Sequence, residues 1–373
     1  MAKIGIMTFW ESQNNYGQLL QGFALQKYLN NKGHDAFIIR FLRVPKVKKR
    51  GILQKIRRFN LNKYLHNRIN RTNILFEKNS KPRQFDAFRN NMIFSEESYK
   101  SLDDLAQSPP DADIYICGSD QIWNDSFPVS CEPFLLDFGS PSVKRVAYAA
   151  SFGKKDLKEE SHDMFIEKLK NFDSISVREQ SAVILCKELG VDNALWVPDP
   201  TLLFNKVEWA KYLEINLQVP KTKKQIFIYT LGNSDIKDRK QFIYYAKSLK
   251  DTEVIHATAN GDFSGNVTPT INEWVKHISM SNFVITTSFH GMVFSIIFGV
   301  NFAILLNTGQ AVGMNERIYS LLSKLGLEDH IMDKFDEDKL IELSTKTVDW
   351  TKVYSILFDW KIVADLFLEK SLN

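Results

Sequence analysis

The chain has 373 residues, of which 44% are hydrophobic and 25% are charged, and its formal net charge is +4. This length predicts two domains, each large enough to bury a core of its own. The sequence has no run of about eighteen apolar residues, and its three cysteines are too scattered for a disulfide framework or a zinc site. We therefore expect neither a membrane span nor a metal. The first residues look like a core strand and not like a signal peptide, so we expect cytoplasmic residence.

A parallel α/β domain is predicted for residues 1–205. A strand at 3–8, a helix at 17–31 and a strand at 35–41 follow the pattern of a βαβ crossover. Further strands are predicted in four apolar runs, at 113–117, 133–138, 145–149 and 174–177. Pro198 and Pro200 then interrupt the pattern and mark the boundary with the next domain.

Residues 43–107 are interpreted as an insertion that carries local basic charge. No acidic residue occurs between Arg43 and Arg71, and residues 52–65 alternate apolar and basic side chains at helical intervals. Two interpretations of this basic amphipathic helix stay open. It is either a solvated face packed on its own domain or a surface that contacts an anionic membrane or a lipid diphosphate at the inner face of the cell membrane. The charge is a local patch, and we expect no nucleic-acid partner.

A second α/β unit is predicted for residues 206–345. Strands are expected at 225–231, 253–257, 283–287 and 301–306, separated by helices at 235–250, 271–280 and 291–299. Residues 346–373 are expected to form a closing helix. The predicted fold class is therefore α/β, with two Rossmann-like domains that face each other across a cleft.

Polar side chains follow two predicted strands of the first domain. In an open parallel sheet, ligands bind beyond the carboxyl ends of the strands, where loops lead into helix N-termini. Amide, carboxylate and aromatic groups at such loops suit sugar hydroxyls, although plain turns and helix caps use the same residue types. The candidates for acceptor binding are Asn14, Asn15, Tyr16, Gly17, Ser119, Asp120 and Gln121.

Two further strand-to-helix turns carry groups suited to an anionic donor. Arg178 follows the strand at 174–177, where its guanidinium can hold a carboxylate or phosphate or can pair with an acidic neighbour. His290 follows the strand at 283–287 and precedes Gly291, which lets the backbone approach a ligand. Because histidine titrates near neutral pH, His290 is the candidate proton donor.

Six motifs of the chain, taken in order, resemble those of the polysaccharide pyruvyl transferases. They are Asn15-Tyr16-Gly17 with Leu20-Gln21, Gly118-Ser119-Asp120-Gln121-Ile122-Trp123-Asn124, Tyr148-Ala149-Ala150-Ser151-Phe152-Gly153, Ser176-Val177-Arg178-Glu179, Asp199-Pro200-Thr201 and Ser288-Phe289-His290-Gly291. The resemblance implies a fold like the glycosyltransferase B fold and phosphoenolpyruvate as co-substrate, with no other cofactor. It also implies a lipid-linked or nucleotide-linked sugar of a surface polysaccharide precursor as acceptor.

The resemblance also assigns roles within the donor site. It implies catalysis by His290 and donor binding by Arg178, together with Ser288 and Gly291 of the last motif. Many family members have an arginine where this chain has Ser288, so Arg317 or Arg145 is expected to supply the missing cation. Two other functions stay open: a nucleotide-sugar glycosyltransferase of the same fold, and a carbohydrate-binding relative without activity.

Overall fold

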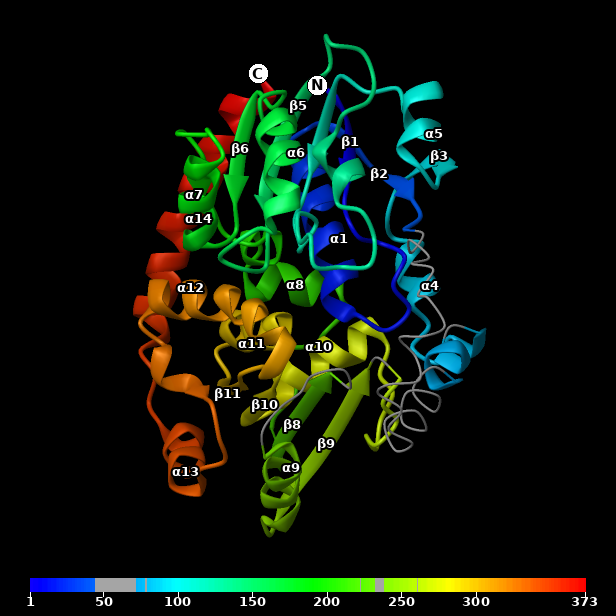
Figure 1. Ribbon diagram of the computed structural model, residues 1–373. Coiled ribbons are helices and arrows are strands. Elements are labelled where there is room, and N and C mark those ends of the chain that lie inside the picture. Colours follow the sequence, from blue (N-terminus) through cyan, green and yellow to red (C-terminus); the bar gives the residue numbers. More distant parts are fainter. Residues whose placement is uncertain (44–71, 78, 222, 232–237, 260) are drawn as a thin grey trace, which may run out of the picture.

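The computed structural model describes residues 1–43, 72–77, 79–221, 223–231, 238–259 and 261–373. Within these residues the chain forms two parallel β-sheets, stacked one above the other in Figure 1. The expected amphipathic helix at 52–65 lies outside the described residues, and so does most of the basic stretch from Arg43 to Arg71.

The upper sheet has seven parallel strands in the order β3-β2-β1-β4-β5-β6-β7. Reversal of the strand order beside β1 is the usual position of a ligand crevice in doubly wound sheets. The elements of this half, in chain order, are β1 Lys3–Met7, α1 Tyr16–Asn31, β2 Asp35–Phe41, α4 Phe85–Arg89, β3 Phe94–Tyr99, α5 Leu102–Gln107, β4 Ile114–Cys117, the 3-10 helix η1 Glu132–Leu135, β5 Lys144–Ala150, α6 Glu159–Leu169, β6 Ser174–Val177, α7 Gln180–Glu188 and β7 Leu195–Trp196.

The lower sheet has five parallel strands in the order β12-β11-β10-β8-β9. After η2 Pro200–Leu203 and α8 Lys206–Tyr212, its elements are β8 Lys224–Leu231, α9 Arg239–Ser248, β9 Thr252–Ala259, α10 Ile271–Met280, β10 Phe283–Thr286, α11 Phe289–Phe298, β11 Asn301–Leu305, η3 Gly309–Asn315, α12 Glu316–Leu325, η4 Glu328–His330, β12 Ile331–Met332 and α13 Glu337–Thr345. The two-sheet α/β architecture predicted from the sequence is confirmed.

The last helix, α14 Trp350–Leu372, leaves the lower domain and runs along the upper one (Figure 1). The indole of Trp360 donates a hydrogen bond to the Trp196 carbonyl at the end of the upper sheet. Phe367 packs beside Tyr148 of β5, and Asp365 forms an ion pair with Lys32. The helix therefore ties the C-terminus of the chain to the first domain.

One predicted strand is wrong, and three strands, β3, β7 and β12, were missed. Residues 133–138 were expected to be extended, but they form η1 and a turn in which Leu136 has φ +56°. Pro133 stands in the first turn of η1, where proline favours a helical start because its missing N–H is not needed there. Strand β3 escaped the sequence analysis because its segment, FSEESY, is mostly polar.

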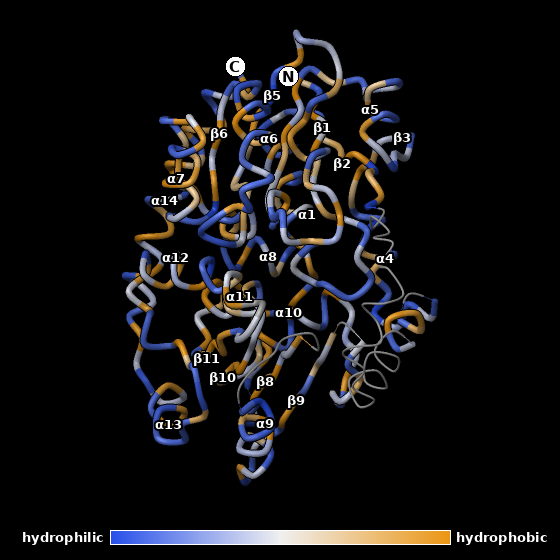
Figure 2. The backbone as a smooth tube through the Cα atoms, viewed as in Figure 1, coloured by the Kyte–Doolittle hydropathy of each residue, from blue (hydrophilic) through white to orange (hydrophobic). Residues whose placement is uncertain are grey.

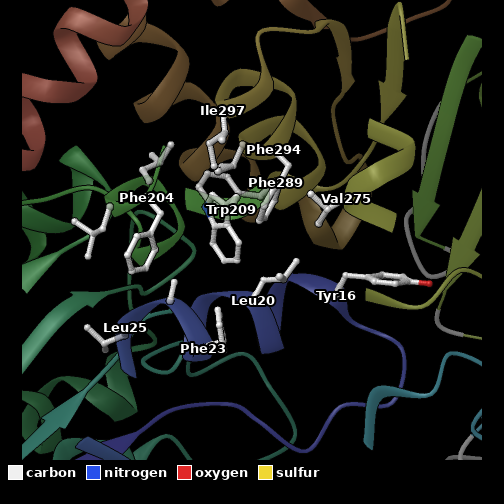
Figure 3. Packing of buried hydrophobic residues seen from close by; sticks show 14 of the residues in the cluster. Tyr16, Leu20, Phe23, Leu25, Phe204, Trp209, Val275, Phe289, Phe294 and Ile297 are labelled. Atoms are coloured by element: carbon white, nitrogen blue, oxygen red, sulfur yellow. The ribbon is translucent and has the colours of Figure 1, made fainter. Parts of the chain in front are cut away.

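The two domains share one hydrophobic cluster, in addition to a separate buried cluster within each domain. Helix α1 is buried over most of its length and has apolar residues on several faces, so it packs on its own sheet and on the second domain. Phe23 of α1 lies against Trp209, whose ring also meets Phe294 of α11 at 5.0 Å (Figure 3). In Figure 2 the central strands of both domains are largely hydrophobic in colour. A continuous apolar junction therefore sets how the two sheets face each other.

Candidate active site

A cavity of about 470 Å³ opens between the carboxyl ends of the two sheets. Loops after β1 and β4 of the first domain line one side, and the loops after β10 and β11 of the second domain line the other. Phe9, Phe127 and Phe289 give it aromatic walls. The polar and charged side chains on its surface are Glu11, Asn15, Gln18, Arg43, Asp120, Gln121, Thr287, Ser288, His290, Asn307 and Arg317.

His290 lies on the first turn of α11, and the local sequence fixes its place. Ser288 caps the helix, accepting a hydrogen bond from the Gly291 amide at 3.3 Å. A side chain at Gly291 would collide with Thr286, so the strand and the helix can only approach this closely at glycine. The His290 side chain is 6% exposed and forms part of the cavity wall.

Gly17 of the first domain lies directly against the imidazole of His290. A Cβ atom built on Gly17 would overlap the ring at Nδ1. Only glycine at position 17 therefore leaves room for the imidazole, and this close approach brings the N-terminal end of α1 beside the N-terminal end of α11. Helix N-termini carry partial positive charge and free N–H groups, which favour an anion between them.

A buried group of charges lies behind the cavity wall. Arg178 Nη1 contacts Asp199 Oδ2 at 2.8 Å, its Nε contacts Glu179 Oε1 at 3.3 Å, and its Nη2 lies 3.6 Å from Asp120 Oδ1. Asp199 Oδ2 is also 3.6 Å from Nε2 of His290. The arginine therefore joins three carboxylates from three different loops, and one of these carboxylates reaches the histidine.

Burial and neighbouring charges shift the pKa values of this group in different directions. Burial alone would raise the pKa of Asp199, but His290 and Arg178 outweigh burial and hold that pKa well below its usual range. Burial raises the pKa of Glu179 despite the attraction of Arg178. Asp199 is therefore ionised at neutral pH and is a permanent negative charge beside the imidazole.

Arg317 is the cation of the second domain that faces the cavity. It belongs to the first turn of α12, where its Nε donates to the Met314 carbonyl at 3.3 Å and its guanidinium lies 5.2 Å from the Phe289 ring. Burial and the nearby Arg178 lower its pKa to about 10, so it stays protonated at neutral pH. Within the described part of the chain no carboxylate forms an ion pair with Arg317, and its charge is available to a ligand.

The structure brings only half of the predicted site residues to the cavity surface. Asn15, Asp120, Gln121, Ser288, His290 and Arg317 line the cavity. Asp120 has φ +71°, a left-handed conformation that aspartate tolerates better than most residues. The remaining predicted residues, Asn14, Tyr16, Gly17, Ser119, Arg178 and Gly291, are not on its surface.

Residues behind the wall have structural partners that explain their place. Asn14 donates to Glu77 at 2.8 Å, and the Tyr16 hydroxyl donates to the Pro269 carbonyl at 2.6 Å while its ring stacks on Trp274. Tyr16 therefore joins the two domains and does not face a ligand. Ser119 donates to the Ala149 carbonyl at 2.7 Å.

Arg145 is excluded as the replacement cation. It is the second residue of strand β5, away from the carboxyl ends of the strands, and its guanidinium donates to the carbonyls of Leu136, Phe138 and Val143. Arg317 is left as the expected substitute for the missing arginine.

Several cavity residues carried no assigned role in the sequence analysis. They are Phe9, Glu11, Gln18, Arg43, Phe127, Thr287 and Asn307. Asp199 was part of a recognised motif, but nothing in the sequence indicated that it would contact residues 178 and 290. The only hint in the sequence that Asp199 has a special role was its position next to Pro200, at a domain boundary.

Two negative findings apply to the described part of the chain. No group of three or more His, Cys, Asp or Glu side chains is arranged there to hold a metal ion. No helix in those same ranges is long and apolar enough to cross a bilayer.

Two Rossmann-like domains with a polar cavity at their facing strand ends define the architecture of glycosyltransferase B folds. A protein assigned as a UDP-N-acetylglucosamine 2-epimerase from Listeria monocytogenes aligns over 100% of this chain and 97% of its own, with 10% identity and a TM-score of 0.50. A UDP-GlcNAc 2-epimerase from Methanocaldococcus jannaschii aligns over 98% and 99%, with 10% identity and a TM-score of 0.49. An α-glucosyltransferase aligns over 98% and 99%, with 12% identity and a TM-score of 0.48. At these identities the likeness concerns the fold alone.

The family model for polysaccharide pyruvyl transferase matches residues 15–309. The chain therefore belongs to the polysaccharide pyruvyl transferase family and is a transferase. No individual curated protein sequence matches it.

Proposed function

We propose that this protein transfers the enolpyruvyl group of phosphoenolpyruvate to a sugar of a surface polysaccharide precursor, where it becomes a pyruvate ketal, and releases phosphate. One observation carries the proposal: His290, Arg317 and the N-terminal ends of α1 and α11 meet at a single cavity between the domains. Phosphoenolpyruvate has a carboxylate and a phosphate, and both suit fixed cations and helix N-termini.

The donor is held chiefly by the second domain in this proposal. Arg317 pairs with one of its anionic groups, and Ser288 with the first amides of α11 binds the other. Arg178 lies behind the wall, where its guanidinium is 4.9 Å from the Phe289 ring that Arg317 also faces. Its charge is balanced by Asp199, Glu179 and Asp120, so Arg317 is the cation that meets the donor. No cofactor is needed, because phosphoenolpyruvate itself carries the activated group.

The reaction is a proton transfer, followed by the addition of one hydroxyl oxygen and then by the displacement of phosphate by a second hydroxyl oxygen. The protonated imidazole of His290 gives its proton to the methylene carbon of the donor, which becomes a methyl group. One sugar hydroxyl adds to the adjacent carbon and returns its proton to the imidazole. A second hydroxyl then displaces phosphate from the same carbon, and its proton leaves with the phosphate.

The acceptor is held chiefly by the first domain. Asp120, Gln121 and Asn15 offer oxygen and nitrogen atoms to sugar hydroxyls, and the Phe127 ring suits the apolar face of a sugar. We propose a lipid-linked or nucleotide-linked sugar as acceptor. The basic stretch that begins at Arg43 would bind the diphosphate of a lipid carrier or an anionic membrane surface.

The main test incubates the purified protein with phosphoenolpyruvate and a panel of lipid-linked and nucleotide-linked sugars, measuring phosphate release and product mass. We expect one phosphate per product and a product heavier by one pyruvate ketal. His290→Gln should lower kcat by about 10²–10⁴-fold, the usual contribution of a general acid. His162→Gln, a half-buried histidine on α6, is the control and should be unchanged.

The same panel separates the two rival functions. Binding of a nucleotide sugar with glycosyl transfer, and no response to phosphoenolpyruvate, would identify a glycosyltransferase. Sugar binding without phosphate release from any combination would identify a carbohydrate-binding relative without activity.

Arg317→Met tests the assignment of the donor site. It should raise the KM for phosphoenolpyruvate by about tenfold or more, because a charge-assisted hydrogen bond of about 1.5–3 kcal/mol is lost. Lys324→Met at the other end of α12 is the matched control. An unchanged KM in Arg317→Met would move donor binding elsewhere.

Sedimentation with vesicles tests the contact with the membrane. We expect more protein to sediment with anionic vesicles than with neutral ones at low ionic strength, and this difference should vanish at high salt. Equal sedimentation with both vesicles would remove the membrane from the proposal.

A further inference from the structure

Asp199 makes more contacts than a helix cap requires. Its Oδ1 accepts hydrogen bonds from the Thr201 amide at 3.0 Å and the Thr201 hydroxyl at 2.7 Å. Its Oδ2 accepts from Arg178 at 2.8 Å and from the Ser119 hydroxyl at 3.4 Å, and it lies 3.6 Å from His290 Nε2. The side chain is fully buried. These contacts fix the carboxylate in one orientation, with Oδ2 directed at the imidazole.

The imidazole of His290 is held between this carboxylate and the first domain's α1. Nε2 is buried and has no hydrogen-bond partner within the described residues, and the charged Oδ2 of Asp199 lies 3.6 Å from it. The opposite edge, Nδ1, lies against Gly17. One nitrogen thus faces a fixed anion, while the other lies beside the N-terminal end of α1, where position 17 has no side chain.

We propose that Asp199 is a positioning residue for His290: it holds the ring by Nε2 and stabilises its protonated form, which leaves Nδ1 to serve the substrate. A contact of 3.6 Å is longer than a hydrogen bond, and such contacts in catalytic sites tighten when the substrate binds. The inference rests on the proposed function only for the role of His290 in turnover. The orientation and charge of the ring can be measured without any substrate.

Other charged groups also lie around the imidazole. Arg178 and Arg317 carry positive charge, Asp120 carries negative charge, and the ion pair of Glu11 with Arg43 lines the same cavity. Asp199 is the acidic group among these that lies within 4 Å of a ring nitrogen. Its removal should therefore have the largest effect on the imidazolium.

Glu179 provides a matched comparison. It too is buried, contacts Arg178 and accepts a hydrogen bond from a serine, Ser151, at 2.5 Å. Unlike Asp199, it forms no contact with His290 in the described structure. Asp199→Asn and Glu179→Gln each remove one carboxylate from the same arginine, and only the first removes the partner of the histidine.

The experiment follows the ring signals of His290 by NMR as a function of pH, in the full-length protein without substrate. Asp199→Asn should shift the midpoint of this titration to lower pH by about one unit, because an anion within 4–6 Å favours the charged ring by about that amount or more. Glu179→Gln should shift it much less. In the activity assay, Asp199→Asn should lower kcat more than it raises the KM for phosphoenolpyruvate, and Asp199→Glu should restore part of the rate.

Two results with these variants, and a third with the unaltered protein, would overturn the proposal. Equal shifts in Asp199→Asn and Glu179→Gln would show that both act only through Arg178. An unchanged midpoint in Asp199→Asn would show that the carboxylate does not act on the ring.

If the variant does not fold, the carboxylate ¹³C signal of Asp199 in the unaltered protein decides. It should change at the pH where His290 titrates and lose this change in His290→Gln, and a flat signal would refute the contact. A protein that lacks pyruvyl transfer but passes the NMR test would contradict the proposed function and leave this inference intact.

Discussion

The two domains meet at two kinds of surface, one apolar and one charged. At the apolar surface, Phe23, Trp209 and Phe294 pack ring against ring without any ionised group. At the charged surface, Asp199 of the first domain is paired with Arg178 and lies 3.6 Å from His290 of the second domain, and all three side chains are buried. The apolar contacts are non-directional and tolerate small shifts, whereas the charged contacts need fixed distances. The comparison indicates that the apolar junction holds the domains at the separation that the charge network requires.

The first test of this division removes the centre of the apolar junction. Trp209→Ala should lower the free energy of unfolding by about 4 kcal/mol, because a fully buried indole and its hydrogen bond to the Thr201 carbonyl are lost. Denaturant unfolding measures this change. Val207→Ala on the same helix is the control, since Val207 is 63% exposed and should change stability by less than about 0.5 kcal/mol. If both variants were equally stable, the apolar junction would not hold the domains.

The second test breaks the charged surface. Arg178→Met should cost about 3 kcal/mol of unfolding free energy and should abolish turnover, because three carboxylates lose their common cation. The exposed pair of Lys3 with Asp111 gives the contrast, and Lys3→Met should cost less than about 1 kcal/mol. A stable and active Arg178→Met would mean that the network is dispensable.

Sequence patterns could predict the apolar half of this comparison but not its full extent. Alternating and helical apolar runs located helix α1 and the strands β1, β2, β4 to β6 and β8 to β11, since burial in a parallel sheet leaves a strong hydrophobic signal. The edge strands β3, β7 and β12 were missed. They did not predict that α1 would join two cores, because a helix with apolar residues on several faces indicates burial without naming the neighbour. The strand expected at 133–138 was wrong for a local reason, the proline at its start.

The residues of the charged surface could be predicted only as separate motifs. Asp120, Arg178 and His290 were all recognised at strand-to-helix turns, and the shared position of such turns placed them at one end of each sheet. The contact of Asp199 with His290 depends on how the two domains dock, which no local pattern encodes. For the same reason, the sequence could not tell that Tyr16 faces Trp274 and that Arg317, not Arg145, faces the cavity.

The third test changes Gly17, which lies where the apolar surface and the charged surface meet. Gly17→Ala should lower kcat by about 100-fold, because the new methyl group displaces the imidazole that it overlaps, and small displacements of a catalytic group have effects of that size. Gly22→Ala on the same helix is the control. Its Cβ would meet Thr8 at 3.5 Å and Met92 at 3.6 Å, which is ordinary contact, so stability should be kept or slightly raised. Full activity of Gly17→Ala would place the reacting group away from His290.

The test with the smallest expected effect compares His290 with His256, another buried histidine of the second domain. His256 on β9 is 1% exposed, and burial together with Arg239 and Lys247 lowers its pKa to about 4. Its ordinary pKa is about 6.5, so between these values the unfolded chain binds a proton that the folded protein does not. The contribution of His256 to the free energy of unfolding is therefore fully present above about pH 6.5. It should fall by up to about 1.4 kcal/mol per pH unit as the pH drops toward 4. His256→Gln should reduce this slope by the contribution of one proton in urea unfolding measured from pH 7 to 4.5, while the buried His330, whose pKa burial also lowers to about 4, keeps its own contribution. His162→Gln should leave the slope unchanged. An unaltered slope in His256→Gln would mean that the buried ring accepts a proton without cost, and would weaken the distinction between a histidine buried for packing and one held for chemistry.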